Sequence, residues 1–284
     1  MSAVWFEQIS IAYRASRWSG SEFHVHFVDV GRHVADGSSF REEPAETFKE
    51  YADEYHVLVY DARGSGYSAA SPPLSHAMWV QDLEELRKWA CAETLILAGG
   101  SYGGFIALEY AIRYPHRLRG LVLRDTAATS SGMIDTAIKH AQESPRVHID
   151  TSKLRRLLAG RVTSNDDFKA LWRAILPLYT YTDDPDAVEE AMKSCIFRFE
   201  THNAAFSGDY QHYDVRDKLY LIQCPVLVTV GRADWACTVE MNQLIAQSVQ
   251  DGTLTVFERS GHSPQVEEKT LWHKRVRGFL RTCR

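Results

Sequence analysis

The stretch Thr94-Leu95-Ile96-Leu97-Ala98-Gly99-Gly100-Ser101-Tyr102-Gly103-Gly104 predicts the fold of this chain of 284 residues. Its first five residues are mostly apolar and are typical of a buried strand. A Gly-x-Ser-x-Gly pattern centred on Ser101 follows, and apolar residues then recur at helical spacing until Pro115. Such a turn forces the serine into strained backbone angles, and side chains in place of its glycines would clash. The stretch therefore predicts a strand, a sharp turn that exposes the Ser101 hydroxyl, and a helix.

A hydroxyl beside the N-terminus of a helix is well placed to attack a carbonyl group, because the helix favours the negative charge that develops there. A serine hydroxyl is nevertheless a poor nucleophile until a base takes its proton, and that base must itself be oriented. The five-residue pattern alone fits a plain loop between a strand and a helix equally well. Acyl-transfer chemistry at Ser101 therefore requires an acid and a base from elsewhere in the chain.

Two short loops offer these groups. Gly231-Arg232-Ala233-Asp234 follows an apolar run at residues 225–231, and Ser260-Gly261-His262-Ser263-Pro264 follows another at residues 253–257. The chain order Ser101, Asp234, His262 is the order in which a strand–turn–helix serine hydrolase carries its nucleophile, acid and base.

Each of these residues has another interpretation. His262 could lie in a plain surface loop, and Asp234 could cap a helix that begins near Thr238. Asp125 ends another core strand and is a rival for the role of the acid. We favour Asp234 because its spacing after its strand and before His262 fits the role better.

Strand-like runs alternate with helical patterns along most of the chain. Residues 9–13 alternate apolar and polar side chains, which favours an early antiparallel strand. Further strands are expected at residues 23–30, 56–60, 94–98, 121–123, 225–231 and 253–257, and helices at residues 77–90 and 269–281. This alternation predicts an α/β fold with a mostly parallel sheet and helices on both faces.

Residues 126–217 break this alternation. They contain no clear strand, and helical patterns recur at residues 151–158, 165–176 and 186–197, the last entered through Asp184-Pro185. We predict that residues 126–217 form a helical cap or lid over the carboxyl ends of the strands, where such sheets bind ligands. Residues 1–125 and 218–284 would then form the core.

Composition and charge exclude several classes of protein. A net charge of −5 without a basic, aromatic-rich stretch argues against nucleic-acid binding. No apolar run approaches the ~20 residues of a membrane span, and the first thirty residues resemble no signal peptide. The five cysteines are scattered without CxxC spacing, which predicts reduced thiols in a cytoplasmic protein without a zinc site. A reactive thiol at Cys237 is less expected than a buried one. No metal or organic cofactor is implied, and the oligomeric state stays open.

Four stretches together resemble the α/β-hydrolase superfamily, and more narrowly its proline iminopeptidase branch. They are the serine turn, Tyr60-Asp61-Ala62-Arg63-Gly64-Ser65-Gly66-Tyr67-Ser68, the Asp234 loop and the His262 loop. The resemblance extends from about Phe23 to the C-terminus and is weaker in the predicted cap. It implies that Ser101, Asp234 and His262 are catalytic, and that residues 61–68 are structural and shape the floor of the pocket.

The resemblance also extends to one segment of the cap. Phe199-Glu200-Thr201-His202-Asn203 is similar to the Glu-x-His segment with which these peptidases are thought to hold the free amino group of a substrate. A solvated glutamate on a cap helix is an equally good interpretation of Glu200.

The chain departs from this family after the strand at residues 23–30. These peptidases carry His-Gly-Gly-Pro-Gly there, a turn that supplies one backbone N–H to the oxyanion hole, whereas this chain has Asp29-Val30-Gly31-Arg32-His33-Val34. The N–H of Tyr102 is expected to supply the other donor, and the N–H of Gly31 or Arg32 could still supply the first. Positive charge from Arg32 and His33 would favour an anionic or carbonyl-rich substrate over a peptide amine.

The sequence therefore predicts a serine hydrolase that acts on an ester, lactone or amide in a small molecule or short peptide. An esterase, a lactonase or a hydrolase of carbon–carbon bonds is the alternative within enzymes. A hydrolase fold kept as a small-molecule receptor with little turnover is the alternative from another class.

Overall fold

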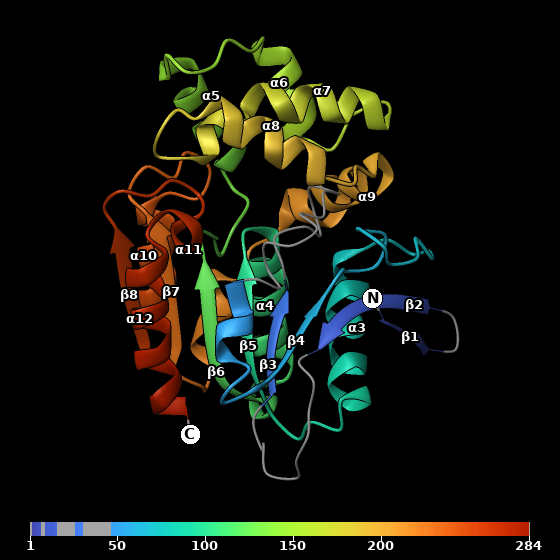
Figure 1. Cartoon of the computed structure of the whole chain (residues 1–284), viewed down its shortest axis with the longest axis vertical. Helices are drawn as coiled ribbons and strands as arrows, with labels where there is room; N and C mark the ends of the chain where they lie inside the picture. Colours follow the sequence, from blue (N-terminus) through green and yellow to red (C-terminus); the bar gives the residue numbers. More distant parts are fainter. Residues whose placement is uncertain (1, 7–8, 16–25, 31–46, 284) are drawn as a thin grey trace.

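The computed structural model describes residues 2–6, 9–15, 26–30 and 47–283 (Figure 1). Eight strands in these ranges form one sheet, in the order β1-β2-β4-β3-β5-β6-β7-β8. The pairs β1–β2 and β2–β4 are antiparallel and the other pairs are parallel, which confirms the mostly parallel sheet. The strands are β1 (Ser2–Phe6), β2 (Ile9–Ala15), β3 (His26–Val30), β4 (His56–Tyr60), β5 (Leu95–Gly100), β6 (Leu118–Arg124), β7 (Val226–Gly231) and β8 (Gly252–Phe257).

Helices cover both faces of the sheet, and the side chains of β5 pack in apolar clusters on both faces. Leu95 and Leu97 pack in a cluster with α3 (His76–Trp89), α4 (Tyr102–Arg113) and α10 (Val239–Ser248). Ile96 and Ala98 pack on the opposite side, with η1 (Lys49–Tyr51) and α12 (Lys269–Leu280). Because successive side chains of a strand point to opposite faces, a strand buried on both sides must be apolar throughout. The short helical segments η2 (Pro115–Arg117), α11 (Pro264–Glu267) and η6 (Arg281–Cys283) complete the core.

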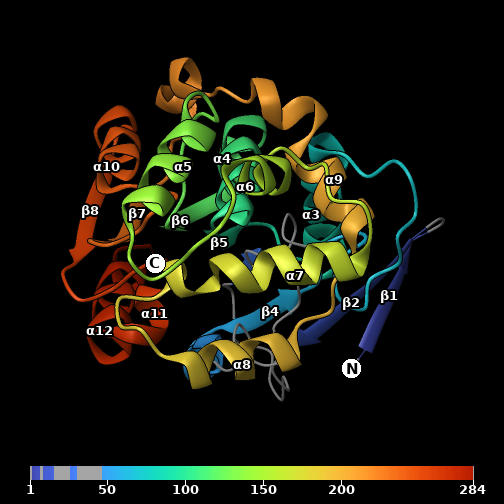
Figure 2. The same ribbon diagram turned by 90° about the horizontal axis from the view of Figure 1, so that it is seen from above.

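Helices fill the segment between β6 and β7 and lie above the carboxyl ends of the strands (Figures 1 and 2). They bury an apolar cluster of their own, in which Leu157, Phe168 and Ile175 have no exposed surface. The elements are α5 (Met133–Glu143), α6 (Thr151–Leu158), α7 (Asn165–Ile175), η3 (Leu176–Tyr179), α8 (Pro185–Ser194), α9 (Phe199–Phe206), η4 (Gly208–His212) and η5 (Arg216–Leu221). We call α5 to α9 the cap helices; that they act as a lid stays a prediction.

The two segments that connect the cap helices to the sheet lie side by side. Thr129 and Asp214 form an isolated antiparallel bridge. The N–H of Ser130 donates to the carbonyl of Tyr213, and the N–H of Val215 donates to the carbonyl of Ala128, each at 2.9 Å. The chain therefore enters and leaves the cap helices at one place.

The loop at residues 61–68 is held by its own side chains and also holds the cap. Arg63 and Asp82 form a buried ion pair through two hydrogen bonds of 2.9 and 2.6 Å. Thr201 on α9 donates its hydroxyl to the carbonyl of Gly64 at 2.6 Å, and Arg198 donates to the carbonyl of Gly66. Removing either partner of a buried ion pair costs about 3–5 kcal/mol, so this loop is a firm support for α9.

In the ranges that the structure describes, no helix combines the length and the apolar character that a membrane span needs.

Candidate active site

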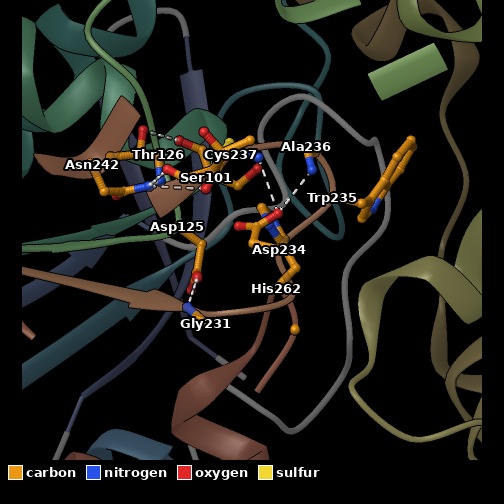
Figure 3. Close-up of polar contacts among 12 residues, drawn as sticks. Ser101, Asp125, Thr126, Gly231, Asp234, Trp235, Ala236, Cys237, Asn242 and His262 are labelled. Carbon is orange, nitrogen blue, oxygen red and sulfur yellow. Dashed lines mark hydrogen bonds and ion pairs between the residues drawn. The ribbon is translucent and has the colours of Figure 1, made fainter. Parts of the chain in front are cut away.

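Ser101 lies between the end of β5 and the first residue of α4, in the strained conformation that its motif predicts (Figure 3). Its φ is 52°, in the left-handed region that residues other than glycine rarely adopt. The N–H of Ser101 donates to the carbonyl of Arg124 at 2.9 Å, and its carbonyl accepts the hydroxyl of Thr126 at 2.8 Å. These contacts with Arg124 and Thr126 hold the strained turn in place.

Two glycines beside Ser101 are required by close packing. A Cβ atom at Gly99 would lie 2.5 Å from the carbonyl oxygen of Gly103, and one at Gly104 would lie 2.4 Å from the hydroxyl oxygen of Thr126. Both distances are far below a normal carbon–oxygen contact. The turn is therefore possible only with glycine at these positions.

Asp234 and His262 form a buried hydrogen-bonded pair. The distance between Nδ1 of His262 and Oδ2 of Asp234 is 2.7 Å, and both residues are at most 5% exposed. An ionised carboxylate only accepts hydrogen bonds, so Nδ1 carries the proton and Nε2 of the neutral ring keeps its lone pair. The other carboxylate oxygen of Asp234 accepts the N–H groups of Ala236 and Cys237 at 2.9 and 3.0 Å. Asp234 thus shapes its own loop with one oxygen and orients His262 with the other.

Close backbone contacts hold the Asp234 loop against the His262 loop. A Cβ atom at Gly231 would lie 1.8 Å from the carbonyl oxygen of Gly261. The N–H of Ala233 donates to the carbonyl of Ser260 at 3.0 Å. From the cap, the carbonyl of Tyr179 accepts the N–H of His262 at 2.8 Å, and its ring lies edge-on to the imidazole. The position of His262 therefore depends on both the core and the cap.

Asp125, the rival for the role of the acid, also lies in this region, but it is hydrogen-bonded to Gly231 (Figure 3). One of its carboxylate oxygens accepts the N–H of Gly231 at 3.0 Å, and the other has no hydrogen-bond partner among the described residues. Burial, with a smaller contribution from the charge of Asp234, raises the pKa of Asp125 to about 8. The carboxyl of Asp125 is therefore neutral at pH 7, and the partner of His262 is Asp234.

The variant Asp125→Asn is expected to change how stability depends on pH. Folding raises the pKa of Asp125 from 3.8 to about 8, so between these values the folded chain binds a proton that the unfolded chain has released. The free energy of unfolding of the wild type should therefore fall as the pH rises from about 4 to 8, by up to about 1.4 kcal/mol per pH unit. Asparagine does not titrate and removes this contribution, so the variant should gain most at pH 8. Urea unfolding at pH 5 and pH 8 measures this, and the same pH dependence in both proteins would contradict it.

The predicted oxyanion donors are only partly within the described residues. Tyr102 is the first residue of α4, and N–H groups in the first turn of a helix have no partner within the helix. Its ring is buried, and its hydroxyl donates to the carbonyl of Ala205 at 3.2 Å. Gly31 and Arg32, predicted as second donors, and His33, predicted to bind substrate, lie outside the described residues. The composition of the oxyanion hole stays a prediction.

A small cavity opens beside Ser101, between the core and the cap helices. Its volume is about 60 Å³. Most of its wall consists of apolar and aromatic side chains that sequence reasoning did not single out, because at helical spacing they look like any other core residue. The described lining residues are Ser101, Tyr102, Phe105, Met133, Ile134, Ala137, Leu158, Tyr179, Phe206, Tyr210, Ala236 and Cys237.

Glu200 does not line this cavity. It is an exposed residue in the first turn of α9, whereas Phe206 at the other end of the same helix reaches the cavity wall. Between them, Nε2 of the buried His202 lies 2.8 Å from the carbonyl oxygen of Leu157. The predicted contact between Glu200 and a substrate amine stays a prediction.

Cys237 is a buried thiol in the cavity wall. One donor atom each from Cys237, Asp234 and His262 lie within 4.8 Å of one another, a grouping that a metal ion could use. Asp234 and His262 are already hydrogen-bonded to each other, however, and this bond would have to break for both to bind a metal ion. Burial, with a smaller contribution from the charge of Asp234, raises the pKa of the thiol well above its usual range. Cys237 is therefore a neutral thiol and a poor nucleophile.

Comparisons with known proteins identify the family of this chain. The sequence model of the family described as alpha/beta hydrolase fold matches residues 35–269. The proline iminopeptidase PfmaB of Pestalotiopsis fici is 30% identical over 282 residues, which cover 98% of this chain and 99% of that protein. The solved structure of a proline iminopeptidase from Mycobacterium smegmatis matches with a TM-score of 0.75 at 18% identity, over 99% of this chain and 98% of that one.

A second solved structure has a similar fold. The enol-lactonase of Burkholderia xenovorans matches with a TM-score of 0.76 at 18% identity, over 98% of this chain and 99% of that one. At such identities the two structures show the fold alone, whereas the family model and the relative from Pestalotiopsis fici show the family. The chain therefore belongs to the α/β-hydrolase family of enzymes, and within it to the proline iminopeptidase-like branch.

Proposed function

We propose that this enzyme is a serine hydrolase in which Ser101, His262 and Asp234 form the catalytic triad. The observation that supports this most is the buried 2.7 Å hydrogen bond between Asp234 and His262, near a serine that is held at a φ of 52°. The strained turn gives Ser101 a defined position at a cavity, and the carboxylate leaves Nε2 of His262 as the base. An ester, a lactone or an amide is the substrate class that this chemistry serves.

In the first half of the reaction, His262 takes the hydroxyl proton of Ser101 while the oxygen attacks the carbonyl carbon. The imidazolium that forms is stabilised by the carboxylate of Asp234, and general base catalysis of this kind contributes about 10²–10⁴ in rate. The backbone N–H of Tyr102 donates to the oxyanion, a contact worth about 10²–10³ in rate. His262 then gives the proton to the leaving group, and an acyl-enzyme forms.

In the second half, a water molecule attacks the acyl-enzyme, and His262 acts again as base and then as acid. Ser101 is regenerated and the carboxylic acid leaves. Every proton transfer in this sequence passes through Nε2 of His262. The hydrogen bond at Nδ1 keeps the ring in the tautomer that both halves need.

Labelling with a fluorophosphonate probe tests this proposal. The probe acts as an acyl mimic and forms a covalent bond only with an activated serine. We expect one adduct per chain, located by mass spectrometry on the peptide that contains Ser101. The matched sample is the protein unfolded in urea, in which the serine loses its base and should not react. An unlabelled native protein would favour the alternative of a small-molecule receptor.

The substrate is a small molecule or a short peptide, and the cavity at Ser101, with a volume of about 60 Å³, would hold its acyl part. Relatives named proline iminopeptidase and a structural neighbour named enol-lactonase span the range from amide to lactone. We infer a cytoplasmic location, since the five cysteines are scattered without the spacing of a disulfide framework, as expected in a reducing compartment.

A further inference from the structure

We propose that the acyl group held in the cavity beside Ser101 is apolar and uncharged, so that the enzyme prefers simple aliphatic acyl groups to amino-acyl groups with a free amine. This inference rests on the proposed function, because it concerns the substrate of the same serine. It departs from the interpretation of Glu200 as a partner of a substrate amine.

The first support is the chemistry of the cavity wall. Cap and core contribute hydrocarbon or aromatic surface to it, such as Phe105 from α4 and Ile134 and Ala137 from α5. The polar atoms on the described part of this wall are few. The hydroxyl of Tyr102 already donates to a backbone carbonyl, and that of Tyr210 contacts the sulfur of Met133 at 3.7 Å. No aspartate or glutamate belongs to the described wall.

The second support is that the described carboxylates around the cavity are either paired or lie outside its wall. Asp234 accepts two backbone N–H groups with one oxygen and pairs with His262 through the other. Glu109, behind Tyr102 on α4, pairs with His76 at 2.9 Å. Glu200 is exposed and lies outside the cavity wall. An ammonium group in the cavity would therefore lose its hydration without gaining a carboxylate from the described residues, which is strongly unfavourable.

The third support is size. A cavity of about 60 Å³ has room for the centres of about four to six water-sized groups, at roughly 10–15 Å³ for each. An acyl group with a five-membered ring or a short branched chain matches this volume. The geometry thus points to short, compact and neutral acyl groups.

A matched pair of boronic acids tests the charge of the acyl group. Cyclopentylboronic acid and pyrrolidine-2-boronic acid have rings of the same size, but the second carries an ammonium in place of one methylene at pH 7. Both form tetrahedral adducts with an activated serine, so no leaving group complicates the comparison. Inhibition constants are measured by competition against the fluorophosphonate probe. We expect cyclopentylboronic acid to bind about 10-fold more tightly or better.

A substitution in the wall supplies the second readout. Ile134 is half-buried in the cavity wall, so Ile134→Glu would place a carboxylate there. This variant should shift the preference toward pyrrolidine-2-boronic acid by about 10-fold or more, whereas the isosteric but neutral Ile134→Gln should not. The ratio of the two inhibition constants is compared within each variant, so a change in overall activity does not affect it.

The outcomes separate this inference from the proposed function. If pyrrolidine-2-boronic acid binds the wild type as tightly as cyclopentylboronic acid, or more tightly, the inference is wrong. If neither compound binds although the probe labels Ser101, the cavity is not the acyl site and the inference is also wrong. A native protein that the probe does not label would instead overturn the proposed function. Should Ile134→Glu fail to fold, the wild-type comparison still decides.

Discussion

Replacing Ser101 with alanine is expected to lower kcat by about 10⁶-fold and to leave the melting temperature within a few degrees of the wild type. The substitution removes the attacking oxygen and nothing else that the reaction needs. The contacts that hold the turn use the backbone N–H and carbonyl of residue 101, which alanine retains. Alanine also has the same Cβ atom, so the strain at a φ of 52° is unchanged.

Turnover of a short-chain aryl ester, with the melting temperature from circular dichroism, measures both parts of this prediction. Ser248→Ala is the matched control, because Ser248 is an exposed serine at the end of α10 that does not line the cavity. The control should keep full activity. A Ser101→Ala protein with more than a few per cent of wild-type turnover would show that another group is the nucleophile.

The second large effect is expected for Asp234→Asn, which should lower kcat by about 10⁴-fold. The amide that replaces the carboxylate would donate its N–H to Nδ1 of His262. The imidazole would then carry its proton on Nε2, where it can no longer act as a base. Because the side chains have the same shape, the loop contacts of Oδ1 with Ala236 and Cys237 are kept.

Asp125→Asn is the matched control for this measurement. It replaces a buried carboxyl of the same region that is already neutral at pH 7 and bonds to Gly231 rather than to His262. We expect kcat of this variant to stay within about threefold of the wild type at pH 7. The opposite pattern, with a large loss for Asp125→Asn and a small one for Asp234→Asn, would assign the role of the acid to Asp125.

The core of the fold could be predicted from the sequence because its strands are local apolar runs bounded by turns. The strand expected at residues 56–60 has the same bounds as β4, and the antiparallel strand expected at 9–13 is β2, which is two residues longer. The helix expected at residues 151–158 matches α6. Of the strand expected at residues 23–30, the part from His26 onward is β3, and the rest lies outside the described residues.

The elements that were not predicted are those in which the local pattern is weak. Strand β1 (Ser2–Phe6) is short and depends on pairing with β2. Helix α5 begins after Gly132 without a side-chain cap, and α9 (Phe199–Phe206) is only eight residues long. Such elements are stabilised by tertiary contacts, such as those that hold α9 on the loop at residues 61–68. Contacts between residues far apart in the sequence cannot be predicted from the local pattern.

The same distinction applies to the candidate site. Ser101, Asp234 and His262 could be predicted because each lies in a short loop directly after a strand, where sequence position implies location in space. The cavity could not be predicted in this way, since Phe105, Ile134 and Phe206 come from three separate helices that meet only in the folded chain. Such residues determine whether the cavity binds an acyl group with an amine or one that is pure hydrocarbon.

The paired segments at Thr129 and Asp214 make the cap helices exchangeable. Because the two ends of the insertion already touch, the entropy of closing it depends only weakly on what lies between them. A different set of helices could be grafted at this bridge without changing the spacing of β6 and β7, provided that a carbonyl takes the place of that of Tyr179 at the N–H of His262. We expect substrate choice to change with the cap helices while Ser101 and Asp234 stay on the core, so a chimaera joined at residues 129 and 214 is a practical route to new acyl selectivity.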